Sequence, residues 1–455
     1  MRFYGKDSPV PGSCNTEPGI PIKPYLEVSW SRELVHVSFK QAGHFSSCAN
    51  IADFTYDVYQ MYLPEEDCSQ RYFLMGYTNF ARVEDILENG FLVATLSHHT
   101  TEFSVSNYPR TGRLLAVVVN NVNSSAVYGL AHTYGWELDD DPENTVGCRP
   151  GDSTFVWVSC ALGVFIGLFL TFMGHRFFKS SQFMFGFYFG SLVGFTLLSL
   201  YTEYDDVLRI VLSGTSGLLS AGLVLLVWWF LGIPVLSVVL PTLEVGFLLA
   251  SVLMYLPLCN MESFSSDSTY WLVFTCFTLT PTVLFIAFTQ KASIISSVVI
   301  GTFTLVLSVD HYTGSNLSSM LTNVLYRATV PDYGAAFSCP PFQKMDLFLV
   351  TCLLGCIALG LVCQLILERK KPPFPPAPYQ QWAWARTVQA EDERTPLIDG
   401  EVAGSPEELP GVPVVGFISG HPGSVQPGSA GRNRSRTNPN QVNNIRPIQR
   451  VRKRS

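Results

Sequence analysis

Side chains that could do chemistry are sparse in this sequence, and Glu244 is the most unusual of them. It lies in the middle of an apolar stretch, residues 234–256. An ionisable group at the centre of a bilayer costs about 3 kcal/mol on insertion scales, so it should face a partner or water. Two interpretations stay open: an ion or proton site, or a protonated carboxyl that is hydrogen-bonded within a helix bundle. The second is favoured, since no lysine or arginine lies deep in another apolar stretch.

A second chemical signal lies near the C-terminus. Glu393 is followed by three residues and then by Leu397 and Ile398. This is the spacing of an acidic dileucine sorting signal, in which the two apolar side chains enter a pocket and the carboxylate meets a basic patch. The pattern predicts a clathrin adaptor as partner. The alternative is a chance match in a polar tail.

Covalent modification is the third kind of chemistry. Asn123-Ser124-Ser125 is a glycosylation sequon in a turn between two strand-like runs. Cys14, Cys48, Cys68 and Cys148 permit two disulfides in any of three pairings if this region faces an oxidising compartment. The alternative is that some of these thiols are unpaired.

Catalytic and metal-binding patterns are not evident. His98 and His99 are adjacent, which is poor spacing for a helical metal pair, and the apolar stretches contain no Ser-His, His-Glu or Asp-Asp pairing. We therefore expect no enzymatic activity, no cofactor, no metal site and no nucleic-acid partner.

Seven apolar stretches place the middle of the chain in a bilayer. A hydrocarbon core of about 30 Å needs about 20 apolar residues per helix, and continuous runs exclude the alternating strands of a barrel. The sixth stretch is short. The predicted transmembrane helices are residues 155–173, 183–200, 208–229, 234–256, 270–289, 294–309 and 347–367.

Charge in the connections predicts the orientation. Basic residues follow the first, fifth and seventh stretches, whereas the opposite connections are acidic or mixed. The positive-inside rule puts the N-terminal region outside or in the lumen and the tail in the cytosol. The basic residues are His175, Arg176, Lys179, Lys291, Arg369, Lys370 and Lys371.

Residues 1–153 have the period-2 alternation of antiparallel strands, and we expect a β-rich, sandwich-like extracellular or lumenal domain. The predicted strands are residues 25–30, 34–39, 57–63, 91–96, 102–106 and 113–120, while residues 70–87 are ambiguous with a helix. Residues 1–6 contain no apolar signal-peptide core, which leads us to expect a segment upstream of Met1.

The rest of the chain divides into a seven-helix domain and a tail. The helices occupy residues 154–370, and residues 371–398 form a Pro-rich juxtamembrane segment that ends in the dileucine-type signal. From Asp399 to Ser455 glycine, proline, serine and asparagine dominate, so we expect a disordered cytosolic tail. Its end, from Arg446 to Arg454, is basic and could touch anionic lipids.

Glycines at four-residue spacing stand out in two of the predicted helices. Gly186, Gly190 and Gly194 form one groove, and Gly163 and Gly167 repeat the spacing in the first stretch. Small residues at this spacing let two helix backbones approach closely. Packing within the bundle is the favoured interpretation, and a homodimer face is the alternative.

Amphipathic spacing also marks the connection between the sixth and seventh stretches. Leu317, Met320, Leu321, Val324 and Leu325 recur at helical intervals. We expect a helix on the outer interface, or one packed back against the bundle.

A collinear series of motifs resembles one membrane-protein family. Their order covers about residues 9–398, and the family is that of the seven-span transmembrane 7 superfamily member 3 proteins; the membrane block also resembles transmembrane protein 198. The motifs include PVPGSCN from Pro9, YDVYQ from Tyr56, AHTY from Ala131, GHRF from Gly174, PPFQ from Pro340 and ERTPL from Glu393.

This resemblance implies a role in cell survival under stress, the unfolded-protein response and secretion, and it brings no enzymatic mechanism. The dileucine-type signal favours the plasma membrane or the endolysosomal system as the location. The ectodomain ligand stays unknown. Two alternatives remain: a receptor coupled to G proteins, and an ion or proton channel or transporter using Glu244. The receptor is disfavoured because the sequence lacks Asp-Arg-Tyr, Asn-Pro-x-x-Tyr and Cys-Trp-x-Pro at the expected places.

Overall fold

The computed structural model describes most of the β-rich region and the membrane block. The described residues are 26–31, 33–39, 54–63, 70–108, 111–121, 124–134, 154–202, 204–255, 266–338, 340, 342–369, 374–375 and 377–392. The tail from residue 393 onward lies outside them, so the prediction of a disordered tail remains a prediction.

Two antiparallel sheets build the N-terminal region. β1 (Leu26–Trp30), β2 (Leu34–Phe39) and β5 (Glu102–Ser106) pair in the order β1-β2-β5. The second sheet has the order β4-β3-β6-β7, with β4 at Phe91–Ser97, β3 at Thr55–Tyr62, β6 at Gly112–Asn121 and β7 at Ser124–Tyr134. The predicted sandwich is confirmed. β7 was not predicted, because Ser124–Tyr134 mixes small, polar and aromatic residues without a clean alternation.

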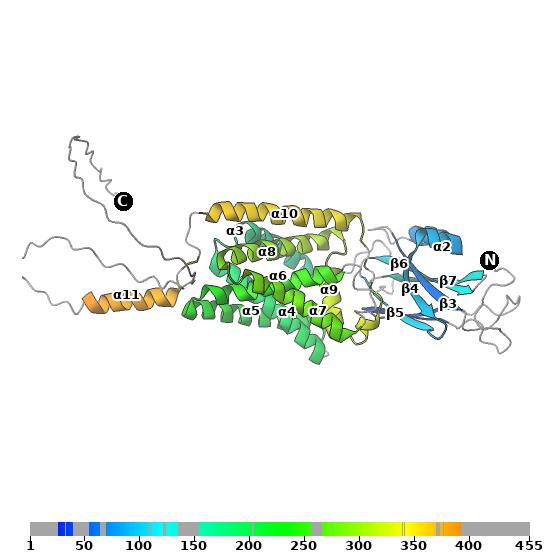
Figure 1. Ribbon diagram of the computed structural model, residues 1–455, viewed down its shortest axis with the longest axis horizontal. Coiled ribbons are helices and arrows are strands. Elements are labelled where there is room, and N and C mark those ends of the chain that lie inside the picture. Colours follow the sequence, from blue (N-terminus) through cyan, green and yellow to red (C-terminus); the bar gives the residue numbers. More distant parts are fainter. Residues whose placement is uncertain are drawn as a thin grey trace, which may run out of the picture. The chain divides into compact units, whose positions relative to one another are not determined.

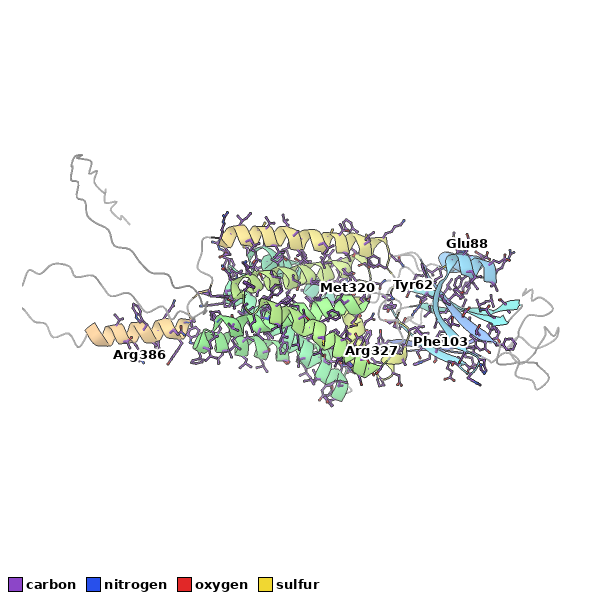
Figure 2. The ribbon with its side chains drawn as sticks, viewed as in Figure 1. Tyr62, Glu88, Phe103, Met320, Arg327 and Arg386 are labelled. Carbon is purple, nitrogen blue, oxygen red and sulfur yellow. The ribbon has the colours of Figure 1, made fainter. Side chains whose placement is uncertain are left out.

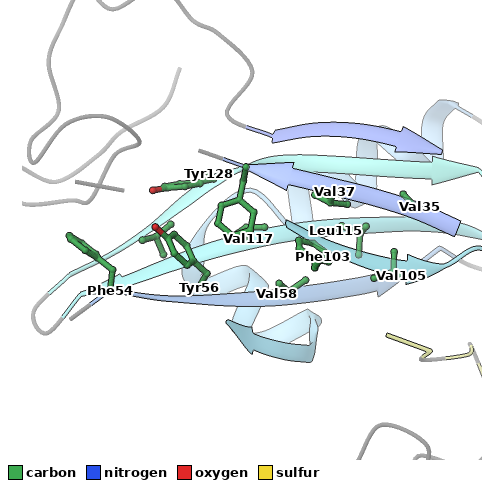
Figure 3. Packing of buried hydrophobic residues seen from close by; sticks show 12 residues of the cluster. Val35, Val37, Phe54, Tyr56, Val58, Phe103, Val105, Leu115, Val117 and Tyr128 are labelled. Carbon is green, nitrogen blue, oxygen red and sulfur yellow. The ribbon is translucent and has the colours of Figure 1, made fainter. Parts of the chain in front are cut away.

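Alternate residues of the strands fill the space between the sheets, as Figure 3 shows. Val35 and Val37 of β2 meet Tyr56 and Val58 of β3 and Val117 of β6, all almost fully buried. On the other face of β6, Leu114, Ala116 and Val118 pack with Phe80 and Ile86 from the helical segment. Because both faces of β6 are covered, it reads as a nearly continuous apolar run.

Residues 70–87, which the sequence left ambiguous with a helix, lie mostly in two helices. α1 spans Gln70–Asn79 and α2 spans Val83–Asn89. Burial of Ile86 and Phe80 ties this part of the chain to the sheet. The helical alternative for this segment was therefore the right one.

Seven helices of the described chain are long and apolar enough to cross a membrane (Figure 1), as predicted. The sixth was predicted too short: α8 extends beyond residues 294–309 at both ends, because polar residues such as Gln290, Lys291 and Asp310 continue the helix. The seven are α3 (Thr154–Met173), α4 (Phe178–Tyr201), α5 (Asp206–Leu231), α6 (Pro234–Tyr255), α7 (Asp267–Phe285), α8 (Thr289–Thr313) and α10 (Lys344–Glu368).

The spanning helices pack in three close pairs. α4 packs against α5, α6 against α7, and α8 returns to α3. α6 also contacts α4 and α8, and α10 covers α8 and α3. Since successive spans alternate in direction, α4, α6 and α8 run parallel to one another, with α6 between the other two.

Shorter helices flank the spans. α9 (Ser319–Thr329) confirms the predicted amphipathic helix, and a 3₁₀ turn, η4, follows at Tyr333–Ala335. Met320 and Val324 are buried against α6, α7, α8 and α10, so α9 packs back against the bundle. After the seventh span, α11 occupies Pro378–Asp392 within the Pro-rich juxtamembrane segment, with proline at its first turn.

Candidate functional site

The glycine groove of α4 is filled by α5. A Cβ at Gly186 would lie 2.7 Å from the Cα of Ala221, and one at Gly194 would lie 2.7 Å from the Cβ of Ser216. A Cβ at Gly190 would meet Ser220 and the backbone of Ser216. Ser216 Oγ donates to the Gly190 carbonyl at 3.0 Å. These contacts are closer than any side chain would allow.

The other two pairs are built in the same way. A Cβ at Gly167 would lie 2.6 Å from the backbone nitrogen of Leu305 in α8, and one at Gly163 would meet Ser308 of the same helix. In the α6–α7 pair, a Cβ at Gly246 would meet the backbone carbonyl of Thr278. The sequence motif did not single out Gly246, because it stands alone rather than at four-residue spacing.

All five glycines that the sequence singled out therefore pack within one chain. Their faces are covered by α5 and α8, which confirms the favoured interpretation. A homodimer, if it forms, needs another surface.

Glu244 lies at mid-length in α6, and its carboxyl is turned into the bundle. Both carboxyl oxygens are buried and make no hydrogen bond of acceptable geometry within the described residues. The backbone of Phe189 in α4 faces the carboxyl. The Tyr188 hydroxyl, also buried without a hydrogen bond of acceptable geometry, lies near Glu244 and next to Thr304 of α8. The helices α4, α6 and α8 thus each carry one polar side chain in this part of the bundle: Tyr188, Glu244 and Thr304.

A proline shapes α6 one helical turn before Glu244. Pro241 has no N–H, so the carbonyl of Ser237 loses its partner within α6. Gln182 of α4 replaces that partner by donating from Nε2 to the Ser237 carbonyl at 2.9 Å. The two groups differ: the Ser237 carbonyl, freed by Pro241, has a side-chain donor, whereas the Glu244 carboxyl has none of acceptable geometry within the described residues.

A junction joins the β-rich region to the segment before α10. Phe337 forms a parallel bridge with Val105 of β5. Its N–H donates to the Ser104 carbonyl at 2.9 Å, and its own carbonyl accepts from the N–H of Ser106 at 3.2 Å. Phe337 also packs against the sandwich core. The loop that follows α9 thus extends the sheet of β5, and Figure 2 labels Phe103 and Arg327 near this junction.

Polar side chains add further links at the junction. Asn316 Nδ2 donates to Thr111 Oγ1 at 2.6 Å, and Gln343 Nε2 donates to the Leu63 carbonyl at 3.1 Å. Tyr108 and Ser338 share a hydroxyl–hydroxyl hydrogen bond at 2.9 Å. These bonds connect two loops of the β-rich region, the one after β3 and the one between β5 and β6, to both ends of the α8–α10 connection.

Two buried aspartates hold that connection in place. Asp310 at the end of α8 accepts from the N–H groups of Leu317 and Ser318, both at 3.1 Å. Asp346 in the first turn of α10 accepts from the N–H groups of Asn316 and Gln343, both at 3.0 Å, and forms a capping box with Gln343. Nothing in the sequence singles these two aspartates out, because they resemble ordinary loop charges.

A buried arginine lies on the sheet side of the junction. Arg113 donates to the Ser106 carbonyl and to Gln60 Oε1, and its guanidinium lies 5.8 Å from the ring centre of Tyr108. Burial raises the pKa of Tyr108 and, more strongly, that of Tyr333, against the opposing effect of the Arg113 charge. The Tyr333 hydroxyl donates to Asn323 Oδ1 at 2.9 Å. These phenols are therefore neutral hydrogen-bonding groups at physiological pH.

Gln364 organises the opposite end of the bundle. Its Nε2 donates to the carbonyls of Leu170 and Thr171, both at 2.9 Å, and its Oε1 accepts from Ser297 Oγ at 3.1 Å. His175, counted among the basic residues after the first span, is buried here: its backbone N–H donates to Gln364 Oε1 at 3.3 Å, and its Nδ1 shares a hydrogen bond with Ser293 Oγ at 3.0 Å. A lone glutamine in an apolar stretch is the signal that could have revealed this network.

Several predicted site residues lie outside the described residues. They are Cys14, Cys48, Cys68, Cys148, Asn123, Glu393, Leu397 and Ile398. Asn123 follows β6 and precedes β7, two strands that pair as a hairpin through Asn121 and Ser124. Within the described part of the chain, no cluster of three or more His, Cys, Asp or Glu side chains could hold a metal ion.

Comparison with known proteins places the two regions in one family. Residues 9–139 match the family described as TM7SF3-like, second immunoglobulin-like domain, and residues 160–365 match the TM7S3/TM198-like domain. Transmembrane 7 superfamily member 3 of Mus musculus is 31% identical over 84% of this chain and 70% of its own length. The Homo sapiens protein of the same name is 30% identical over 85% of this chain and 70% of its own length. No solved structure matches the chain. The chain therefore belongs to the transmembrane 7 superfamily member 3 family, as an integral membrane protein with an immunoglobulin-like domain and a seven-helix block.

Proposed function

We propose that this protein is a non-enzymatic membrane protein that supports cell survival under stress, the unfolded-protein response and secretion by passing ligand binding at its immunoglobulin-like domain to its seven-helix block. The observation that carries the proposal is the junction at Phe337. This loop residue pairs with β5 and lies in the connection that leads into α10. A ligand that shifts β5 would therefore act directly on that connection.

Hydrogen bonds that anchor the connection at both ends support this route. Asp310 and Asp346 fix the segment around Asn316 from both sides, and Asn316 in turn bonds to Thr111 of the β-rich region. The hydrogen bonds cross between parts of the chain that are distant in sequence. A movement of the loop at Thr111 would thus reach the ends of α8 and α10 with few intermediate contacts.

The proposal includes a topology. The β-rich domain lies outside or in the lumen, where Asn123 is glycosylated and disulfides among Cys14, Cys48, Cys68 and Cys148 can form. The tail lies in the cytosol. The basic residues at the ends of the first, fifth and seventh spans support this orientation.

Short connections argue against the receptor alternative. On the side where α3 ends, the hairpins are joined by residues 174–177, 232–233 and 286–288 only. Gly232, at the tightest of these turns, has φ +58°, which favours glycine there. Loops this short offer little surface to a G protein. The channel or transporter alternative rests on Glu244, and transport needs more than a site that binds an ion.

The functional proposal is tested by rescue. Cells that lack the protein receive either wild type or Phe337→Pro, which removes the N–H that bonds to Ser104, and are then exposed to an agent that unfolds proteins in the secretory pathway. We expect wild type to restore survival and a normal stress-reporter signal, and Phe337→Pro to do so only weakly at equal surface amounts. Phe342→Ala, at an exposed position beside the junction, is the control. Equal rescue by all three would refute the proposal.

The tail proposal has its own test. Leu397→Ala combined with Ile398→Ala should move the protein from endolysosomal membranes to the cell surface, because the two apolar side chains that enter the adaptor pocket are lost. An unchanged distribution would rule out the sorting signal and leave the junction proposal intact.

A further inference from the structure

The three inner helices of the membrane block, α4, α6 and α8, meet at a buried cluster of Phe185, Val245 and Ile300, and Glu244, Tyr188 and Thr304 each lie within one helical turn of that cluster in the sequence. Glu244 comes from α6, Tyr188 from α4 and Thr304 from α8. We refer to these three side chains as the inner polar layer. It combines one carboxyl group with two hydroxyl groups.

The hydrogen-bonding capacity of this layer is unmet. Both Glu244 oxygens and the Tyr188 oxygen are inaccessible from outside and make no hydrogen bond of acceptable geometry in the described part of the chain. Thr304 Oγ1 donates a hydrogen bond to the Ile300 carbonyl at 2.8 Å, and the lone pairs of Oγ1 take no part in that bond. Buried polar groups are almost always paired, and each exception calls for an explanation.

Apolar side chains close the layer from one side. Phe185 of α4, Val245 of α6 and Ile300 of α8 form one buried cluster, against which Tyr188 and Leu248 pack. Phe185 and Ile300 lie one helical turn before Tyr188 and Thr304. The layer is thus shielded at mid-span.

If Glu244 were a neutral carboxyl with a purely structural role, we would expect it to make a hydrogen bond. A protonated Glu244 should donate to a carbonyl or hydroxyl oxygen, in the way that Gln182 donates to the Ser237 carbonyl two turns earlier in α6. Within the described residues, Glu244 makes no such bond of acceptable geometry.

We propose that the inner polar layer is a binding site for one small monovalent cation such as Na⁺. Alkali cations in membrane proteins are held by oxygen ligands near mid-span, where helices meet. One carboxylate balances one positive charge, whereas a divalent ion would leave a net charge in a medium of low dielectric constant. Hydroxyl oxygens of Tyr188 and Thr304 would complete the ligand set.

Sodium binding to the full-length protein in lipid nanodiscs tests the proposal. Radioactive ²²Na⁺ binding and the thermal unfolding midpoint are measured while NaCl replaces choline chloride at constant ionic strength. We expect saturable binding and a rise in the unfolding midpoint for wild type. Glu244→Gln should lose both effects, and Thr304→Val should bind roughly tenfold more weakly, equivalent to one lost ligand.

Controls separate binding from folding. Thr280 of α7 is exposed and makes the same kind of bond to its own helix, from Oγ1 to the Cys276 carbonyl at 2.7 Å. Thr280→Val should therefore bind Na⁺ like wild type. Glu244→Gln should unfold cooperatively in choline, since the amide has the shape of the carboxyl. The proposal is overturned if wild type shows no saturable Na⁺ effect, or if Glu244→Gln responds as wild type does.

Discussion

The helix pairs inside the bundle and the junction with the β-rich region hold the chain together in opposite ways. In the pairs α4–α5, α3–α8 and α6–α7, glycines bring the helices so close that an added Cβ would meet the facing helix. At the junction, single hydrogen bonds such as that from Asn316 to Thr111 join the two regions. Such bonds can be exchanged for water at modest cost. The comparison shows which part is built to be rigid and which part can transmit a signal.

The largest effect is expected from Gly246→Val. The added side chain would meet the backbone carbonyl of Thr278, which cannot move away without separating α6 from α7. Overpacking of this kind costs about 3 kcal/mol or more, so we expect a misfolded protein that is retained and degraded. Gly222→Val is the control, because a Cβ at Gly222 meets nothing within 4 Å. Fluorescence-detected size exclusion compares the two, and equal monodisperse peaks would disprove the close-contact account.

Asp310→Asn should have the next largest effect. The amide would place a donor where the carboxylate now accepts from Leu317 and Ser318. We expect a loss of about 2 kcal/mol in the free energy of unfolding, the cost of leaving a buried donor unsatisfied. Denaturant unfolding in detergent measures this loss. Asp332→Asn, at an exposed position with φ +62°, should change little because asparagine tolerates that conformation.

Gln364→Leu tests whether polar bonds add to the packing of α10. The variant loses the bonds to Leu170, Thr171 and Ser297, but leucine suits the apolar surroundings. Side-chain hydrogen bonds in membrane bundles contribute about 0.6 kcal/mol each, so the three lost bonds cost about 2 kcal/mol, of which the buried leucine recovers part, and we expect a net loss of about 1 kcal/mol. A more stable variant would mean that this network serves something other than stability.

Tyr108→Phe should have the smallest effect on stability. It removes the hydroxyl that bonds to Ser338 but keeps the ring beside Arg113. We expect about 1 kcal/mol or less, confined to the junction. Hydrogen exchange should become faster in the loop before α10 and stay unchanged in α4 and α5. Faster exchange throughout the bundle would contradict the separation of the two regions.

The sequence predicted the parts whose signals are local. In the described part of the chain, continuous apolar runs located all seven spans and period-2 alternation located six of the seven strands. The spacing of Leu317, Met320 and Val324 located α9. The hydropathy pattern predicted too short a helix at α8. Hydropathy measures solvent preference, and Lys291 and Asp310 are polar residues that remain helical.

The junction could not be predicted, because it is made by residues distant in sequence. Nothing near Phe337 indicates that it pairs with Val105, and Asp310 and Asp346 look like ordinary loop charges until the fold buries them. Glu244 was visible as an anomaly. Its neighbours Tyr188 and Thr304 were not, since each is unremarkable within its own helix.

The most direct test of the junction is the hydrogen exchange of two amides in the full-length protein in nanodiscs. The Phe337 N–H donates to Ser104, and the Ser106 N–H donates to Phe337. If the loop before α10 extends the sheet, both amides should be protected to a similar degree and should lose protection together in Phe337→Asp. Exchange of the Phe337 amide at the rate of an open loop, with β5 still protected, would contradict the account.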